Sequence, residues 1–300
     1  MTVVAGVDIG GTKIAAGLVS ESGRLLRSSA VATPADAGPV AVVDAAAKAV
    51  TELGGPVAAV GVGSAGVVDP VSGRIVSATE ALPGWAGTPL RDELRERLGV
   101  PVAVDNDVHA HALGEAWLGA GAGCGSVLLI AVGTGIGASL IVDGRVRHGA
   151  HGVAGHAGHI PVPGADGRPC TCGGTGHVEA VASGPALLAE YRRRGGADVA
   201  DLAGVSVRAD GGEELAAAVL AEGATALGHA VGGLVNMIDP EVVLISGGVS
   251  RCGAAWWDPL RSVVGSHVLP PLAGVPVTAG RLGNDAALLG AARLALEAVA

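Results

Sequence analysis

The sequence predicts an α/β protein of two domains, and three observations lead to that prediction. Its 300 residues are enough for two hydrophobic cores of ordinary size. Hydrophobic residues make up 49% of the chain and charged residues 16%, which excludes a disordered chain and fits a compact soluble enzyme. Short apolar runs that end at glycines alternate with segments of helical spacing, a pattern typical of strands and helices in one chain.

The first 117 residues contain five expected strands and three expected helices. The strand patterns cover residues 3–7, 14–19, 24–31, 56–62 and 101–104. The helical patterns cover residues 36–53, 89–98 and 108–117. Strands and helices that alternate in this way are typical of an α/β sheet with covering helices.

The turn between the first two strands has the composition of a phosphate-binding turn. The backbone amides of Gly10 and Gly11 can approach an anion, while Thr12 and Lys13 add a hydroxyl and a charge. Asp8 directly before them is suited to hold a metal-bound water. A plain hairpin turn explains the same residues, and the spacing differs from that of a Walker loop.

Three polar residues follow the strand at 101–104 and precede the helix at 108–117. They are Asp105, Asn106 and Asp107. A carboxylate at such a corner is held rigidly, and we expect nearby backbone dipoles to favour its charged form. The alternative is a helix cap, in which these side chains accept hydrogen bonds from backbone amides.

Residues 116–142 carry no charge, which by length alone would suit a membrane span. Seven glycines divide this stretch, so we expect two strands, 126–132 and 136–142, joined by the turn Gly133-Thr134-Gly135. Helices are expected at 185–194 and 213–237, with a mobile connection at 195–212. A buried strand at 241–246 leads into Gly247 and Gly248, and Trp256 and Trp257 are expected in the core.

The segment 156–179 has the composition of a metal loop. His159, Cys170, Cys172 and His177 supply the two thiolates and two imidazoles of a tetrahedral zinc site. Glycines and a proline make the loop too weak to hold its own shape, so a structural zinc ion would serve as its core. Free thiols with surface histidines are the alternative, and a disulfide between Cys170 and Cys172 would close a poor ring.

The net charge indicates which partners the protein is suited to bind, and the cysteines indicate in which compartment it works. The net charge of −9 argues against nucleic acid as the main partner, because phosphate binding depends on a basic face. Four clustered cysteines fit a reducing cytoplasm better than a disulfide scaffold. The first eight residues lack the basic segment of a signal peptide, so we expect a cytoplasmic protein without a membrane anchor.

The zinc loop and four further motifs resemble the ROK family of bacterial sugar kinases. The motifs are 8–13, 66–69 with Leu-Pro-Gly-Trp at 82–85, Asn106-Asp107 with Ala-Leu-Gly-Glu at 112–115, the turn at 133–137, and the loop at 156–179. The resemblance implies an actin-like ATPase (ribonuclease H-like) fold, with two lobes around a central cleft. The small lobe would comprise 1–115, completed by a helix at 284–300, and the large lobe 116–283.

The resemblance also implies the roles of individual residues. Asp107 would be the general base of an ATP-dependent hexose 6-kinase. Sugar would be bound by Gly66, Asn106, Asp107, His156, His159 and Glu179. Mg²⁺ and ATP would be bound by Asp8, Gly10, Gly11, Thr12, Lys13, Gly133, Thr134, Gly135, Gly247 and Gly248. The family implies a homodimer or homotetramer.

Three positions depart from the family pattern. His177 stands where the last zinc ligand is usually cysteine, His156 where a sugar-binding glutamate is usual, and Ala81 where asparagine is usual. The latter two changes favour a modified hexose, such as the amino sugar kanosamine, over glucose. Alternatives are an N-acetylmannosamine or N-acetylglucosamine kinase, or a non-catalytic sugar sensor. A regulator with a helix-turn-helix segment is not expected, since the first strand begins at Val3.

Overall fold

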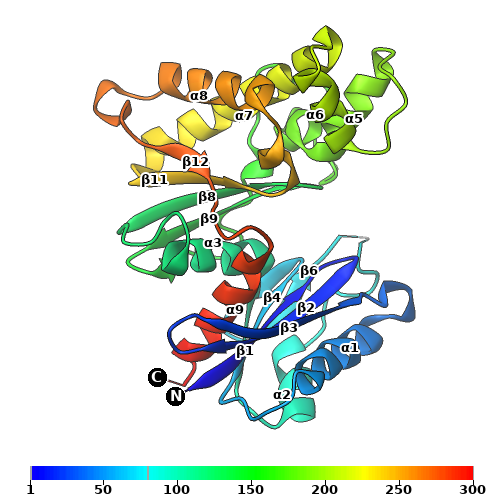
Figure 1. Ribbon diagram of the computed structural model, residues 1–300, viewed down its shortest axis with the longest axis vertical. Coiled ribbons are helices and arrows are strands. Elements are labelled where there is room, and N and C mark those ends of the chain that lie inside the picture. Colours follow the sequence, from blue (N-terminus) through cyan, green and yellow to red (C-terminus); the bar gives the residue numbers. More distant parts are fainter. Residues whose placement is uncertain (1, 80, 300) are drawn as a thin grey trace. The chain divides into compact units, whose positions relative to one another are not determined.

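The structure is a computed structural model that describes residues 2–79 and 81–299 (Figure 1). The chain forms two compact units. Unit 1 consists of Met1–Gly125, Ser139–Ala154 and Arg281–Ala300. Unit 2 consists of Ser126–Ala138 and Gly155–Gly280. Unit 1 thus takes in a segment, 139–154, that lies outside the ranges 1–115 and 284–300 expected for the first lobe.

Unit 1 is built on a five-stranded sheet in the order β3-β2-β1-β4-β7. Its strands are β1 (Val3–Ile9), β2 (Lys13–Ser20), β3 (Leu25–Ala32), β4 (Val60–Ser64) and β7 (Val102–Asn106). The first three are antiparallel, as the hairpin turn predicts, and β4 and β7 run parallel to β1. The pairing places Asp8, Gly63 and Asp105 in one row across β1, β4 and β7.

Helices cover both faces of this sheet (Figure 1). Helices α1 (Pro39–Glu52) and α2 (Leu90–Leu98) pack together against β2 and β7, and α3 (Asp107–Leu118) and α9 (Ala286–Glu297) pack together against β1 and β4. All four lie within the ranges predicted from sequence, to a few residues at each end. A short hairpin of β5 (Val67–Asp69) and β6 (Arg74–Ser77) was not predicted, because each of its strands is too short to show periodicity.

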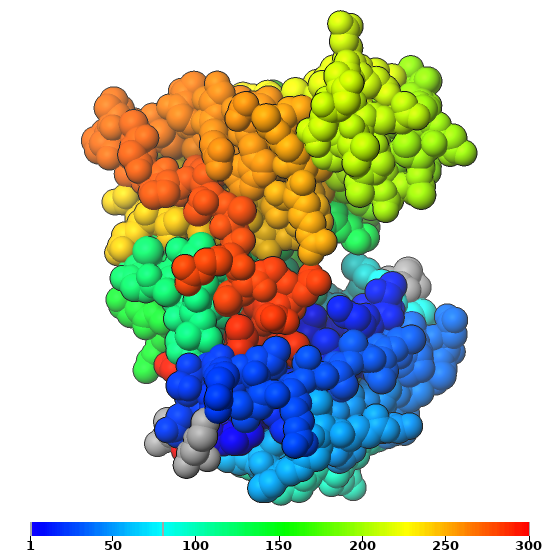
Figure 2. Space-filling model, viewed as in Figure 1, coloured from blue at the N-terminus to red at the C-terminus, as the bar shows by residue number. Residues whose placement is uncertain are grey.

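Glycines let α9 pack directly on the strands beneath it. A Cβ at Gly61 of β4 would lie 1.7 Å from the carbonyl oxygen of Ala291, and one at Gly6 of β1 would lie 2.1 Å from that of Leu288. On α9 itself, a Cβ at Gly290 would lie 1.6 Å from the carbonyl oxygen of Ala110 in α3. In Figure 2 the red atoms of the C-terminal segment accordingly lie against the blue atoms of the first strands.

We expect Gly61→Ala to destabilise unit 1 by about 3 kcal/mol or more, the upper range for overpacking. Its φ is not in the left-handed region, so the cost comes from the clash with α9 rather than from backbone strain. Gly233→Ala is the matched control, since this exposed helical glycine has open space around its Cβ position. Urea unfolding measures both variants, and equal midpoints would contradict close packing of α9 on β4.

The second sheet has the order β10-β9-β8-β11-β12. Its strands are β8 (Ser126–Val132), β9 (Ile136–Val142), β10 (Arg145–Val146), β11 (Val242–Ser246) and β12 (Val277–Ala279). The uncharged stretch at 116–142 therefore forms the two predicted strands, β8 and β9. Strands β8, β11 and β12 are parallel, so their carboxyl ends meet at one edge.

Unit 2 carries the helices α4 (Glu179–Ala182), α5 (Gly184–Arg193), α6 (Leu202–Asp210), α7 (Glu214–Ile238) and α8 (Ala254–His267). The prediction of a mobile connection at 195–212 is wrong, because α6 occupies half of it. The Asp201 side chain accepts a hydrogen bond from the amide of Gly204 and caps α6. Val205 is fully buried in the unit 2 core. One capping residue and a short apolar pattern at Leu202, Val205 and Ala209 were too weak a signal to indicate this helix.

Helix α7 is long and apolar enough to span a bilayer, and among the described residues it is the one helix that meets this test. It packs against α6 and α8 in the core of unit 2, and most of its apolar window is buried. Trp256 of α8 is fully buried in the same core, and Trp257 packs against it, as predicted. Arg261 covers the Trp257 ring at 4.6 Å from the ring centroid.

Candidate functional site

The carboxyl ends of β1, β4 and β7 bring together Asp107, the predicted general base, and Asp8, a predicted cofactor-binding residue. Asp8 and Asp105 share a row of the sheet with Gly63 between them. Gly63 also makes room for the first turn of α3, because a Cβ there would lie 3.4 Å from the Cα of Asp107. Asp107 is the first residue of α3 and is half-buried. The sheet thus places Asp8 and Asp107 close enough for their charges to interact.

Asn106 is the N-cap of α3, so the capping alternative is confirmed for this residue. Its Oδ1 accepts hydrogen bonds from the amides of Val108 at 2.9 Å and His109 at 3.3 Å. Its Nδ2 donates to the carbonyl oxygen of Gly66 at 2.9 Å. Gly66 has a φ of +97°, and a Cβ there would lie 2.5 Å from the carbonyl oxygen of Ser77. The side chain of Asn106 therefore links its own corner to Gly66, a second predicted sugar-binding residue, while it caps α3.

Burial raises the pKa of Asp107 to about 7, and the negative charge of Asp8 adds to the rise. The amide of Val108, which donates to Asp107 Oδ1 at 2.9 Å, opposes it. Burial likewise raises the pKa of Asp8 to about 6, against the opposing charge of Lys13. Backbone groups do favour a charged Asp107, as expected, but burial and the charge of Asp8 outweigh them. A carboxylate with a pKa near neutrality is suited to accept a proton.

The raised pKa of Asp107 predicts how stability changes with pH. Its pKa is 3.8 when unperturbed and about 7 when folded. Between these values the folded state binds more protons than the unfolded state, so the free energy of unfolding falls as pH rises. We expect Asp107→Asn to lose less melting temperature between pH 5 and pH 8 than the parent does. Asp166→Asn, at an exposed position of unit 2, should follow the parent, and parallel curves for all three proteins would refute the raised pKa.

The glycine turn of unit 1 is a hairpin connection with an exposed tip. The amide of Gly10 donates to the carbonyl oxygen of Lys13 at 3.0 Å, and Thr33 Oγ1 donates to the carbonyl oxygen of Gly10 at 2.7 Å. Thr12 and Lys13 are exposed, so both remain accessible to a ligand. Thr33, which anchors the turn from the end of β3, was not identified from the sequence.

In unit 2 the two other glycine turns meet at the carboxyl ends of β8 and β11. A Cβ at Gly247 would lie 2.4 Å from the carbonyl oxygen of Val132, the last residue of β8. Gly247 also has a φ of +88°, so this position requires glycine on both grounds. The carbonyl oxygen of Gly133 accepts a hydrogen bond from the amide of Gly184 at 2.9 Å. The start of α5 therefore lies beside the 133–135 turn, and its first amides are paired with Gly133 and with Ser183.

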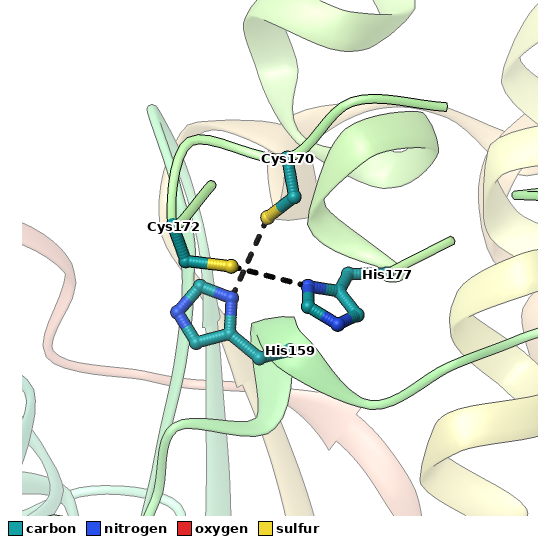
Figure 3. Close-up of side chains that lie close together, drawn as sticks. All are labelled: His159, Cys170, Cys172 and His177. Atoms are coloured by element: carbon teal, nitrogen blue, oxygen red, sulfur yellow. Dashed lines mark hydrogen bonds between the residues drawn. The ribbon is translucent and has the colours of Figure 1, made fainter. Parts of the chain in front are cut away.

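The four predicted zinc ligands lie together in unit 2 (Figure 3). Their ligand atoms are all within 4.8 Å of one another. Cys170 Sγ lies 3.5 Å from His159 Nδ1, and Cys172 Sγ lies 3.3 Å from His177 Nδ1. A tetrahedral zinc ion with bonds of about 2.3 Å to sulfur and about 2.0 Å to nitrogen separates these atoms by about 3.5 Å. The cluster therefore fits zinc, and the four cysteines are free, so the disulfide alternative is wrong.

Glu179 connects the zinc loop to the glycine turn of the same unit. Its Oε1 accepts from Thr171 Oγ1 at 2.6 Å, and its Oε2 accepts from the amide of Ile136 at 2.8 Å. A Cβ at Gly135 would lie 2.7 Å from that Oε2, which explains the glycine. His156 is exposed, and its ring stacks on that of His159 with the centroids 6.2 Å apart. The structure thus groups the predicted sugar-binding residues of unit 2 around the metal cluster.

Two buried acidic groups of unit 1 have partners that sequence reasoning missed. Glu115 is fully buried, and it accepts hydrogen bonds from the amides of Ala120, Arg281 and Leu282 at 2.7–3.0 Å. It thereby holds the end of α3 to the segment that enters α9. Asp105 is 3% exposed and pairs with His148, whose Nε2 lies 2.7 Å from Asp105 Oδ2. No sequence pattern indicates that residues 43 positions apart are partners.

A profile of the ROK family matches residues 4–298. The chain belongs to the ROK family. A glucokinase of Thermotoga maritima is 36% identical over 98% of this chain and 97% of that protein. An N-acetyl-D-glucosamine kinase of Erwinia tasmaniensis is 33% identical over 97% of this chain and 99% of that protein.

Among solved structures, a ROK glucokinase of Streptomyces griseus in complex with glucose and AMPPNP superposes with a TM-score of 0.84. The two chains are 37% identical in sequence. The match covers 98% of this chain and 99% of the Streptomyces griseus chain. The likeness confirms the predicted actin-like ATPase fold with two lobes. Full-length similarity to ROK sugar kinases also supports the broad prediction that this chain is an ATP-dependent sugar kinase.

Proposed function

We propose that this ROK protein transfers the γ-phosphoryl group of ATP to the 6-hydroxyl of a hexose. The observation that carries the proposal is the placement of Asp107. It lies at the start of α3 beside the strand end that carries Asp8, and its pKa is raised to about 7. That combination suits a general base at neutral pH. The similarity to a glucokinase that binds glucose and an ATP analogue supports the same reaction.

In the proposed mechanism, Asp107 accepts the proton of the sugar hydroxyl as the oxygen attacks phosphorus. The electron pair of the hydroxyl forms the new P–O bond, and ADP leaves with the electrons of the broken one. Proton transfer to a positioned base contributes about 10²- to 10⁴-fold. Asn106 positions the base, because its side chain caps the helix on which Asp107 lies.

The glycine turns are the proposed nucleotide-binding elements. Gly10, Gly11, Thr12 and Lys13 offer amides, a hydroxyl and a positive charge in unit 1. The turns at 133–135 and 247–248 would offer amides in unit 2. Asp8 would hold a water of the Mg²⁺ that accompanies ATP, which neutralises charge on the transferred phosphoryl group.

The zinc loop would position sugar ligands rather than take part in the chemistry. His159, Cys170, Cys172 and His177 already supply four ligands, so a zinc ion there is closed to substrate. Glu179 and Thr171 share a hydrogen bond next to the cluster, which fixes the carboxylate. A metal bound to one nitrogen of His159 would fix the imidazole ring. The other face or the other nitrogen of that ring would then meet a sugar hydroxyl.

The experiment that tests the proposed function is ADP release by the purified protein with Mg-ATP. The acceptors are glucose, mannose, glucosamine, N-acetylglucosamine, N-acetylmannosamine and kanosamine, and phosphorus NMR of the product identifies the hydroxyl. We expect one sugar to stand out and to yield its 6-phosphate. If no sugar turns over while one raises the melting temperature, the protein is a sugar sensor and the kinase proposal fails.

His156 is proposed to set the choice of sugar. A neutral imidazole offers one donor and one acceptor, whereas a glutamate in its place would accept two hydroxyl hydrogen bonds. We therefore propose an amino sugar such as kanosamine as the preferred substrate, and we expect His156→Glu to shift preference towards glucose by about 10-fold or more. His151→Glu, an exposed position five residues earlier, is the control. The ratio of kcat/KM for the two sugars measures the effect, and an unchanged ratio would exclude this role.

A further inference from the structure

A second cluster of metal-ligating side chains lies in unit 1, apart from the residues of the zinc loop. It consists of Asp105, His109 and His148, whose ligand atoms all lie within 4.8 Å of one another. The three come from different elements: the end of β7, the first turn of α3, and the segment after β10. Asp105 is 3% exposed and His109 is 5% exposed. Burial of three titratable groups costs hydration free energy, which hydrogen bonds, ion pairs or a bound metal must offset.

The hydrogen bonds around the cluster orient its members towards one another. Asp105 Oδ1 accepts from the amide of Asn106 at 2.7 Å, so Oδ2 faces His148, whose Nε2 is 2.7 Å away. His109 Nδ1 lies 2.9 Å from the Oγ of buried Ser139. This contact fixes the ring of His109, which offers one of its nitrogens to the group of ligand atoms within 4.8 Å of one another. The rings of His109 and His148 meet edge to face, with their centroids 5.2 Å apart.

We propose that Asp105, His109 and His148 form a second site for a divalent transition-metal cation such as Zn²⁺. Two imidazoles and one carboxylate are a ligand set for such cations, with the fourth position left to water. Nitrogen and oxygen ligands on a tetrahedral zinc ion lie about 3.3 Å apart, so the observed 2.7 Å between Asp105 and His148 requires only a small opening. The His148 side chain is 26% exposed, which gives the cation a route in from solvent.

A cation at this position would join the segment 143–154 to the helix that carries Asp107. That segment contains Gly144, Gly149 and Gly152, each with a positive φ, and beyond β10 it forms turns rather than regular structure. The metal would link its His148 to Asp105 and His109, which flank Asn106 and Asp107 in sequence. The second site would thereby stiffen the corner between β7 and α3.

Cobalt titration of metal-free protein tests the proposal, because Co²⁺ reports the ligand type. Cobalt bound to thiolates shows an intense near-ultraviolet charge-transfer band, which a site of nitrogen and oxygen ligands lacks. We expect two equivalents in the parent, with only the first to contribute the thiolate band. Cys170→Ser with Cys172→Ser should keep one equivalent without that band. His109→Gln and His148→Gln should each keep one equivalent with the band intact.

His151→Gln, which removes an exposed histidine of the same segment, should still bind two equivalents. A single equivalent in the parent, all of it with the thiolate band, would overturn the proposal and leave the cluster as a hydrogen-bonded network. Retention of both equivalents in the two histidine variants would overturn it as well. The parent titration requires no variant to fold, and metal counts do not depend on sugar turnover. Failure of the kinase proposal is thus a separate result.

Discussion

Asp107→Asn is expected to lower kcat by about 10²- to 10⁴-fold, with little change in the KM for ATP. The substitution preserves volume and shape, and an amide oxygen can still accept the hydrogen bond that Val108 donates at 2.9 Å. Asn106 still caps α3 through Val108 and His109, so the helix should form as before. The expected loss therefore reflects the missing proton acceptor and not a displaced helix.

The measurement is steady-state ADP release at saturating sugar, with sugar binding followed by thermal shift. Asp166→Asn serves as the matched control, because this exposed residue lies outside the proposed site. We also expect kcat/KM of the parent to fall below about pH 7, where Asp107 becomes protonated. An Asp107→Asn variant that keeps more than about a tenth of the parent kcat would show that another group takes the proton.

Cys170→Ser is expected to release the metal of the zinc loop and to lower the melting temperature by about 5–10 °C, given about 2–4 °C per kcal/mol for domains of this size. Cys170 is buried, and burial raises the pKa of its thiol, so without a cation the loop contains a neutral buried thiol. The loop between η2 (Ala157–His159) and α4 holds isolated β-bridges and turns, with little regular structure of its own. The proposed metal would therefore add to the order of this loop.

Zinc content by mass spectrometry and melting temperature with and without a chelator measure this effect. The parent should lose more melting temperature on chelation than Cys170→Ser, which already lacks the metal of the loop. Cys124→Ser is the control, since Cys124 lies in unit 1, outside the loop. Equal zinc content in the parent and in Cys170→Ser would show that the loop is not the metal site.

Local signals in the sequence were sufficient for most elements. The strands at 126–132 and 136–142 were predicted to the residue, because apolar runs between glycine turns leave little choice of bounds. Short elements escaped prediction for the opposite reason. Helix α6 and the β5–β6 hairpin bury few side chains each, so neither repeats a pattern often enough to stand out.

The candidate site was predictable where its chemistry is local. The zinc ligands fall within 19 consecutive residues, from 159 to 177, and the glycine turns are single motifs, so spacing alone indicated them. The environment of Asp107 was not predictable, because polar residues between a strand and a helix serve as a helix cap in some proteins and as a base in others. Burial and the charge of Asp8, on another strand, decide the pKa of Asp107.

By itself, the sequence determined the family, the order of the elements and the composition of each turn, because these depend on neighbours along the chain. Only the tertiary structure decided which distant residues meet. It paired Asp105 with His148, and it set Gly61 of β4 under Ala291 of α9, 230 positions later. Such contacts arise from the packing of whole sheets and helices. How closely two backbones approach, and how deeply a side chain is buried, depends on every element that packs at that point.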